Sequence, residues 1–298
     1  MTAPRLMGVI NVNKPTGMTS RDVVNRVVSV VKPNKAGHAG TLDPLATGVL
    51  IVCVGAATRL MTRVQEMRKV YRGTFQLGVR SNTDDTEGEL VTVPDAPSVT
   101  EDEIRRLLPN FVGDIEQVPP AYSAVHVNGQ RAYQLVRKGV DVQIPARTVT
   151  VHRIDLLLLS GNQLELEIEC GSGTYIRSIG RDLGDELGCG AVMSSLVRTR
   201  IGHFDLASAV DLRQVTAEQI ENILQPALSV VKHLPQYECI ETDIEYLRNW
   251  RPMVSRARFT DGDEVAMVSE NEVVAVVRYQ SSDNHLLPQK VFVQVDGS

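Results

Sequence analysis

The chain has 298 residues, enough for one large domain and a smaller one. Hydrophobic residues make up 43% and charged residues 22%, as in an ordinary globular protein, and no apolar run of about 18 residues could span a bilayer. A formal net charge of −5 argues against indiscriminate nucleic-acid binding, and 4% aromatic residues argue against an extended stacking platform for single strands. Since no signal peptide opens the chain, we expect a cytoplasmic protein.

The charge is distributed unevenly. Residues 1–206 carry 23 basic and 22 acidic side chains, whereas residues 207–298 carry 8 basic and 14 acidic ones. A polyanionic partner is therefore expected to meet the first part, and the acidic end is expected to be a solvated satellite. Four cysteines without C-x-x-C spacing predict neither a zinc site nor a disulfide framework: Cys53, Cys170, Cys189 and Cys239.

The first predicted elements are a strand at residues 8–13 and a helix at residues 20–31. Ser20 is the expected N-cap, and Thr19-x-x-Asp22 is typical of a capping box. Valines then form an apolar helical face, which ends before Pro33.

The later elements alternate between the two types. In chain order we expect a strand at 49–54, a basic helix at 57–67, strand 71–79, a helix at 101–108 capped by Thr100, strands 148–159 and 164–170, helices 175–187 and 218–231, and strands 264–268, 273–279 and 291–295. Antiparallel strand pairs with helices packed to one side indicate an α+β fold. The last three strands have the size and pattern of a small β-barrel.

One loop, residues 37–48, gathers a histidine, a carboxylate and glycines between a helical pattern and an apolar strand. Asp43 precedes a proline, which biases it towards an extended conformation and fixes the direction of its side chain. A plain turn would also explain Asp-Pro beside glycine. The pattern alone leaves a turn and a catalytic carboxylate both open.

The whole loop is similar to a family signature. From Gly37 to Leu50 the chain matches G-H-x-G-x-L-D-P-x-A-x-G-x-L, which resembles the bacterial tRNA pseudouridine synthase B (TruB) family. The resemblance continues in the right order through K-P-T-G-M-T-S at 14–20, K-V-Y at 69–71, P-P-A-Y-S-A at 119–124 and G-T-Y-I-R-S at 173–178. These motifs cover roughly residues 8–205, and the last ninety or so residues match only weakly.

The resemblance implies an architecture. Residues 1–235 would form a catalytic domain with a mixed, largely antiparallel sheet and an inserted thumb segment at 119–140, which closes over RNA. Residues 236–298 would form a small, β-rich, PUA-like RNA-binding module.

The resemblance also implies a reaction. We expect isomerisation of uridine to pseudouridine at position 55 in the T-loop of tRNA, after base flipping, without metal or cofactor. Asp43 would be the nucleophile or base, and its attack on C1′, attack on C6 or removal of a sugar proton all stay open. Arg177 would pair with it, Tyr71 would stack on the base, and Tyr175 and Leu196 would line the uracil pocket.

RNA contacts are expected from a histidine and several cations. His38 would fill the gap left by the flipped base, and the basic run after residue 58 would meet backbone phosphates. Lys14 belongs to a family motif that supports the active-site loop. The residues predicted to contact RNA are His38, Arg59, Arg63, Lys69, Lys14 and, in the thumb, Arg137.

Two other functions fit parts of the pattern. A non-catalytic RNA-binding or tRNA-folding protein could use the same surface, although it would not need a pocket carboxylate. A glycosyl hydrolase would show two acidic residues in separate motifs, and only one is evident. Guide-RNA-dependent relatives lack the thumb segment, so we expect a monomer that acts on the tRNA T-arm without a guide RNA or protein partner.

Overall fold

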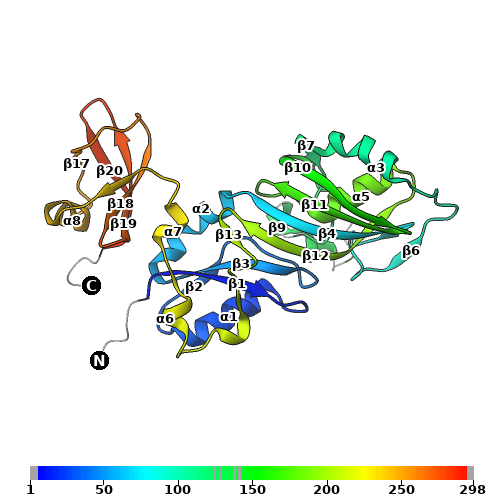
Figure 1. Ribbon diagram of the computed structural model, residues 1–298, viewed down its shortest axis with the longest axis horizontal. Helices are drawn as coiled ribbons and strands as arrows, with labels where there is room; N and C mark the ends of the chain where they lie inside the picture. Colours follow the sequence, from blue (N-terminus) through cyan, green and yellow to red (C-terminus); the bar gives the residue numbers. More distant parts are fainter. Residues whose placement is uncertain (1–5, 124, 128, 137–138, 140–141, 294–298) are drawn as a thin grey trace.

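The structure, a computed structural model, describes residues 6–123, 125–127, 129–136, 139 and 142–293. Its described part is elongated, with a large sheet along most of the length and a smaller sheet at one end (Figure 1). None of the helices in these ranges combines the length and apolar character needed to cross a membrane.

The large sheet has eleven strands among the described residues. Its main path is β14 (Val210–Asp211), β1 (Gly8–Lys14), β3 (Thr47–Val54), β12 (Ala191–Ile201), β4 (Lys69–Leu77), β11 (Gln163–Cys170), β10 (Arg147–Ser160) and β7 (Gly113–Gln117), with β2 (Ala36–His38), β13 (Phe204–Asp205) and β15 (Gln225–Pro226) at its sides. Only the pairs β1–β14 and β3–β12 are parallel in this described sheet. The expected mixed, largely antiparallel sheet is confirmed.

The second sheet has five described strands. Its order is β16 (Gln236–Glu238), β18 (Glu264–Ser269), β19 (Glu272–Gln280), β20 (His285–Val291) and β17 (Met253–Val254). Two small hairpins join β5 (Val79–Ser81) to β6 (Leu90–Thr92) and β8 (His126–Val127) to β9 (Gln130–Arg131). The expected β-rich C-terminal part is present, and the exact domain limits at 235 and 236 stay a prediction.

The helices are short. They are α1 (Ser20–Val31), α2 (Met61–Glu66), α3 (Glu101–Leu107), α4 (Ala132–Val136), α5 (Ile176–Glu186), α6 (Ile220–Ile223), α7 (Leu228–Val231) and α8 (Glu241–Arg248), with the 3₁₀ turns η1 (Gly55–Leu60), η2 (Leu108–Phe111) and η3 (Leu212–Gln214). The predicted helices at 20–31, 101–108 and 175–187 are confirmed within a residue or so at their ends. The predicted helix at 57–67 is a 3₁₀ turn followed by α2.

The start of α1 differs from the prediction in one residue. Thr19, not Ser20, is the N-cap: its hydroxyl accepts from the amide of Asp22, whose carboxylate accepts from the amide of Thr19. The hydroxyl of Ser20 instead donates to the carbonyl of Leu42 at 3.1 Å and accepts from its amide at 2.8 Å. Ser20 therefore fastens the loop that carries Asp43 to the helix.

Two further predictions are wrong. The helix expected at 218–231 is broken into α6, β15 and α7, because Pro226 lacks the amide hydrogen that a helix interior needs and instead pairs with β1. The strand expected at 291–295 lies earlier, as β20 at residues 285–291, and residues 294–295 lie outside the described part.

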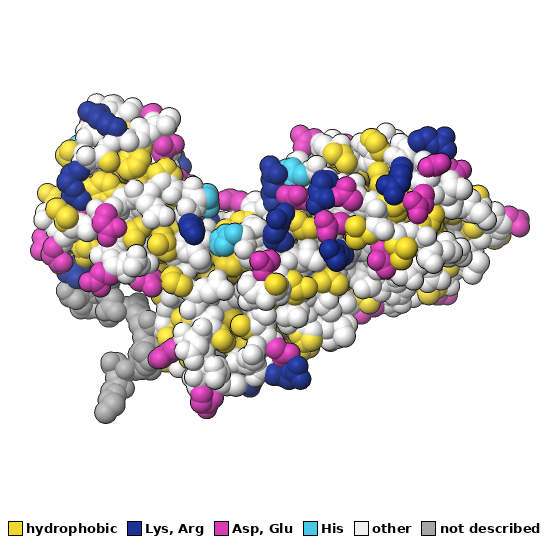
Figure 2. All heavy atoms as spheres, viewed as in Figure 1, with side chains coloured by type: hydrophobic (Ala, Val, Ile, Leu, Met, Phe, Trp, Pro, Cys, Tyr) yellow, Lys and Arg dark blue, Asp and Glu magenta, His cyan; other side chains and the backbone are white. Residues whose placement is uncertain are grey.

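One face of the large sheet carries cross-strand ion pairs. Arg72 and Arg153 both contact Glu167, with N–O distances of 3.2 and 2.9 Å, and Arg200 lies 3.8 Å from Glu169. Basic and acidic side chains are accordingly interleaved on the face seen in Figure 2. Exposed pairs of this kind stabilise a fold by only about 0–1 kcal/mol each.

The two sheets share one hydrophobic core. Ala57 and Val64 from the η1–α2 segment and Val9 and Ile51 from the large sheet belong to the same buried cluster as Val268 of the small sheet. The last part of the chain is therefore not the solvated satellite expected from its charge, because apolar residues of the small sheet are packed in one cluster with the large sheet and the η1–α2 segment.

The close packing of α5 on β4 provides a stability test. An added Cβ at Gly180 would lie 2.2 Å from the Cδ1 of Phe75, a fully buried side chain. We expect Gly180→Ala to lower the free energy of unfolding by about 1–3 kcal/mol, since overpacking forces the ring from its position. Denaturant unfolding measures the change. Gly171→Ala is the control, because its Cβ would meet nothing closer than 3.5 Å; an equal effect in both variants would contradict the packing argument.

Candidate active site

Asp43 lies in a loop that is fixed from three sides. The carbonyl of Pro44 accepts from the amide of Gly17 at 2.9 Å and from the ammonium of Lys14 at 3.3 Å. Ser20 holds Leu42, and the amide of Ala46 donates to the carbonyl of Asp43 at 3.1 Å. The Asp43 side chain is 37% exposed. The backbone of Asp43 is therefore fixed, while its carboxylate remains accessible from the cavity.

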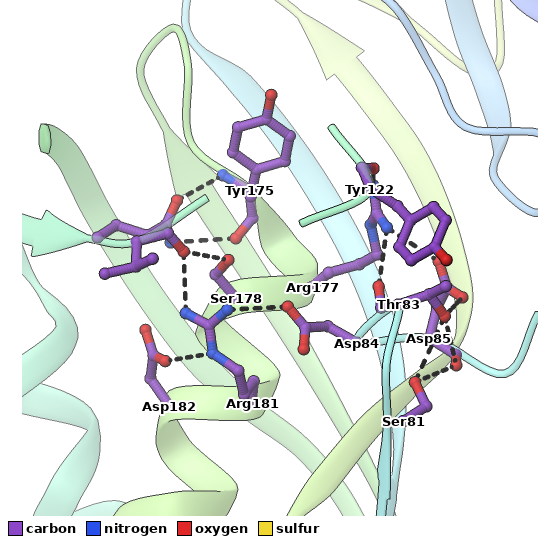
Figure 3. Close-up of polar contacts among 12 residues, drawn as sticks. Ser81, Thr83, Asp84, Asp85, Tyr122, Tyr175, Arg177, Ser178, Arg181 and Asp182 are labelled. Atoms are coloured by element: carbon purple, nitrogen blue, oxygen red, sulfur yellow. Dashed lines mark hydrogen bonds and ion pairs between the residues drawn. The ribbon is translucent and has the colours of Figure 1, made fainter. Parts of the chain in front are cut away.

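Arg177, near the start of α5, lies between two carboxylates. Its Nη2 is 3.1 Å from Oδ2 of Asp43, and its Nη1 is 3.2 Å from Oδ2 of Asp85. It also donates to the carbonyls of Thr83, at 2.8 Å, and Tyr122, at 3.2 Å (Figure 3). With 5% of its side chain exposed, Arg177 is a buried cation whose charge is balanced on both sides.

Asp85 is itself fully engaged. Its Oδ1 accepts from the hydroxyl of Thr83 at 2.5 Å and from the amide of Glu87 at 3.1 Å, and its side chain is 4% exposed. One residue earlier, Asp84 pairs with Arg181 at 2.9 Å (Figure 3). Arg177 and Arg181 are one helical turn apart, so α5 holds the acidic turn at two successive points.

Tyr71 packs beside a second buried cation. Its ring lies 5.9 Å from the guanidinium of Arg198, which is 1% exposed and donates to the carbonyls of Val49 and Gly40. Burial raises the pKa of the Tyr71 phenol, against the opposing effect of Arg198. The phenol therefore stays protonated at neutral pH, as a donor rather than a base.

Tyr175 is oriented through its backbone. Its amide donates to the side chain of Gln117 at 2.8 Å, and its carbonyl accepts from the same side chain at 3.1 Å. The guanidinium of Arg147 lies 5.0 Å from the centre of its ring. Tyr175 immediately precedes α5, so these contacts also fix the start of the helix that carries Arg177.

These side chains surround one cavity of about 940 Å³. That volume falls in the range of small-molecule sites and is ample for a flipped nucleoside. The structure brings together five of the predicted site residues and Lys69 on its walls. The lining includes Asp43, Tyr71, Tyr175, Arg177, Leu196, Lys69, Asp85, Tyr122 and Arg198.

Lys14 has no exposed surface in this structure, so the RNA contact expected of it stays a prediction. Its side chain is fully buried, and its ammonium donates to the carbonyls of Pro15, Met18 and Pro44. Burial lowers its pKa to about 8, while the charge of Asp43 opposes that change. Its place under the Asp43 loop fits the other expectation, a support for that loop.

The remaining predicted RNA contacts are placed differently from one another. Lys69 is 5% exposed and donates to Gln65 and Ser172. The guanidinium of Arg59 donates to the carbonyl of Val291 at 2.6 Å, and Arg63 pairs with Glu264, so both contact the small sheet. Phosphate binding by any of these cations would compete with these contacts and stays a prediction. Arg137 lies outside the described residues.

His38 ends β2 and is partly buried, with no hydrogen-bond partner for its Nδ1 in the described structure. Burial lowers its pKa below the usual 6.5, and the charges of Arg21 and Arg198 act in the same direction. The imidazole is therefore neutral at pH 7.

Comparison with known families agrees with this site. Residues 28–176 match the model described as "TruB family pseudouridylate synthase (N terminal domain)", and residues 177–232 match "tRNA pseudouridylate synthase B C-terminal domain". The chain belongs to the TruB family of pseudouridylate synthases. The second match ends before the small sheet begins at Gln236.

Several TruB-family relatives are similar over almost their whole length. A tRNA pseudouridine synthase B of Dehalococcoides mccartyi is 40% identical over 292 residues, covering 96% of both chains. One of Ruegeria sp. is 40% identical and covers 97% of both.

Solved structures agree on the fold. The "Structure of H/ACA RNP bound to a substrate RNA containing 2'-deoxyuridine" has a TM-score of 0.74 and 26% identity, covering 97% of this chain and 86% of that one. The "Crystal structure of the archaeal box H/ACA sRNP Nop10-Cbf5 complex" has a TM-score of 0.72 and 27% identity, covering 97% and 87%. The expected pseudouridine synthase fold is confirmed.

The TruB-type site contains residues that the sequence motifs did not indicate. Asp85 belongs to the acidic stretch Asp84-Asp85-Thr86-Glu87-Gly88, which is typical of a turn, and only this clustering set it apart. Arg198 gave no separate signal, and Ser20 was expected to cap a helix rather than to hold the Asp43 loop. All of these act on residues far away in sequence.

Asp85 provides a test of positioning. In Asp85→Asn the guanidinium of Arg177 loses the charged partner that fixes its orientation, so Asp43 should be positioned less accurately and turnover should fall by about 10- to 100-fold, the range for disturbed supporting contacts. Pseudouridine formation at saturating RNA measures it. Asp182→Asn is the control, since among the described residues the carboxylate of Asp182 forms an ion pair with Arg181 and none with Arg177. Equal losses in both variants would count against the special position of Asp85.

The histidine provides a pH test. Because its folded pKa lies below the unfolded value, the unfolded state binds more protons as the pH falls through 6.5, and stability is lost on acidification. We expect the free energy of unfolding to fall less between pH 7.5 and 5.5 in His38→Gln than in the parent. Carboxylate protonation is common to both proteins and cancels in the difference. Identical pH dependences would show that His38 titrates normally.

Proposed function

We propose that this chain converts uridine to pseudouridine in the T-loop of tRNA, at position 55, with Asp43 as the reacting carboxylate. The observation that carries the proposal is the Asp43–Arg177 pair at the wall of the cavity. The family model and the names of the relatives, tRNA pseudouridine synthase B, support the substrate. A monomeric state, a cytoplasmic location and independence from metal, cofactor, guide RNA and protein partners stay predictions.

The reaction breaks the N1–C1′ bond, rotates the uracil and joins it again through C5. It needs an ionised carboxylate beside the sugar and a closed place for the detached base. The cation of Arg177 pairs with the carboxylate of Asp43 and directs it towards the cavity wall. A carboxylate so placed can form a covalent adduct or remove a proton, and the geometry is compatible with either.

The cavity walls suit a flat, partly polar base. The ring of Tyr71 offers a stacking surface and its protonated phenol a hydrogen-bond donor, while Leu196 and Tyr175 supply apolar contacts. His38, neutral at pH 7, would fill the space that the flipped base leaves in the loop, which offsets part of the few kcal/mol of unstacking.

A glycosyl hydrolase is the alternative that the second carboxylate suggests. Such an enzyme uses one carboxyl group as acid and the other as nucleophile or base. Both oxygens of Asp85 are already bonded, to Arg177, Thr83 and the amide of Glu87, and its side chain is 4% exposed. Asp85 therefore orients Arg177 and has no free oxygen for a sugar.

The decisive experiment compares the parent, Asp43→Asn and Asp102→Asn on an unmodified T-arm hairpin. The amide keeps the volume of Asp43 but is neither nucleophile nor base, so turnover should fall by about 10³-fold or more while RNA affinity stays nearly unchanged. Asp102 is an exposed residue of α3, so its variant should behave as the parent.

Two outcomes would contradict the proposal. Turnover of Asp43→Asn within tenfold of the parent would remove Asp43 from the chemistry. A parent that binds the hairpin and forms no pseudouridine would support the non-catalytic RNA-binding function instead.

A further inference from the structure

The short segment of η1 and α2, residues 55–66, lies between the small sheet and the cavity. Thr62, Gln65 and Glu66 of α2 line the cavity. In Figure 1, α2 lies near α7, where the two sheets meet. A displacement of α2 would therefore move one wall of the site.

Polar contacts attach this segment to the small sheet. The ammonium of Lys290 donates to the carbonyl of Arg59 at 2.8 Å, and Arg59 donates in turn to the carbonyl of Val291 at 2.6 Å. Arg63 of α2 pairs with Glu264 of β18, and these two side chains are only 20% and 23% exposed. A half-buried ion pair is screened less by water than a surface pair.

Apolar contacts accompany them. Leu60 and Val64 are fully buried and belong to the same cluster as Ala266 and Val268 of β18. The guanidinium of Arg59 also lies 5.2 Å from the ring centre of Phe292. One side of the segment is thus covered by α7 and the small sheet together.

The other side of α2 forms hydrogen bonds with residues at the wall of the cavity. The carbonyl of Gln65 accepts from the ammonium of Lys69 and from the hydroxyl of Ser172, and the last two are 3.1 Å apart. Ser172 lies in the turn that leads into Tyr175 and α5. The contacts therefore continue from Glu264 through α2 to the helix that carries Arg177.

The helix α2 cannot fix its own position. It has six residues and no side-chain N-cap, whereas isolated helices shorter than about 12–15 residues are marginal in water. Its order must come from the surfaces on either side.

We propose that the small sheet positions α2, and with it one wall of the cavity, with Glu264 and Lys290 as positioning residues. The sheet then contributes to the reaction on an RNA that need not touch it. The part of this inference that concerns turnover rests on the proposed function.

The first test needs no RNA. Amide hydrogen exchange is measured on the parent, on Glu264→Gln and on Glu238→Gln. Glu238 is an exposed carboxylate of β16, on the same sheet, whose side chain forms no hydrogen bond or ion pair with the described residues, so it is the matched control. Exchange in residues 61–67 should become at least about threefold faster in Glu264→Gln alone, since local opening depends on the contacts that cover a helix. Unchanged exchange would overturn the proposal.

The second test uses turnover and a charge swap. On the isolated T-arm hairpin, Glu264→Gln should lower kcat/KM by about 3- to 10-fold, within the range of indirect coupling. Exchanging the charges, in the double variant Arg63→Glu with Glu264→Arg, should restore most of the loss.

The two tests together distinguish a failure of the positioning role from a failure of the proposed function. Faster exchange in α2 with unchanged turnover would refute the positioning role while leaving the proposed function intact. A parent without activity would refute the proposed function, and the exchange experiment would still decide whether the sheet holds α2. Equal losses in Glu264→Gln and Glu238→Gln would indicate a general effect of charge and contradict the specific contact.

Discussion

The site depends on the charge of one buried guanidinium. A cation with 5% exposure costs several kcal/mol unless opposite charges and hydrogen bonds offset the loss of water. Arg177 meets this constraint with Asp43, Asp85 and the carbonyls of Thr83 and Tyr122. These contacts bring four segments of the chain together around the guanidinium of Arg177.

The need to balance the charge of Arg177 also explains why its two carboxylate partners have different surroundings. Asp85 is closed in and saturated with donors, so it balances charge, whereas Asp43 keeps part of its surface in the cavity and stays available for reaction. Beneath the loop, Lys14 and Ser20 use buried polar groups to hold the backbone. The loop backbone that carries Asp43 is therefore fixed by buried hydrogen bonds.

Much of this could be predicted from the sequence wherever the signal was local. The alternation at 163–170 gave its strand, and the Thr19–Asp22 spacing gave the start of α1. The central strand β12 was not predicted, because register shifts at Met193/Ser195 and Arg198/Arg200 disturb the period of two that marks a strand. Asp85 was missed because its partner Arg177 lies 92 residues further along the chain. The contacts of Arg59 and Arg63 with the small sheet were not predicted, since charge alone does not show which partner a side chain meets.

The core that joins the two sheets has a consequence for how the molecule melts. Cooperative folding units are defined by shared buried surface rather than by the number of sheets. Because Val9 and Ile51 lie in the same cluster as Ala266 and Val276, the small sheet cannot come away without exposing apolar surface of the large one. Heating should thus produce a single calorimetric transition, in which the van't Hoff and calorimetric enthalpies of unfolding agree. Two independently unfolding domains would instead give two transitions.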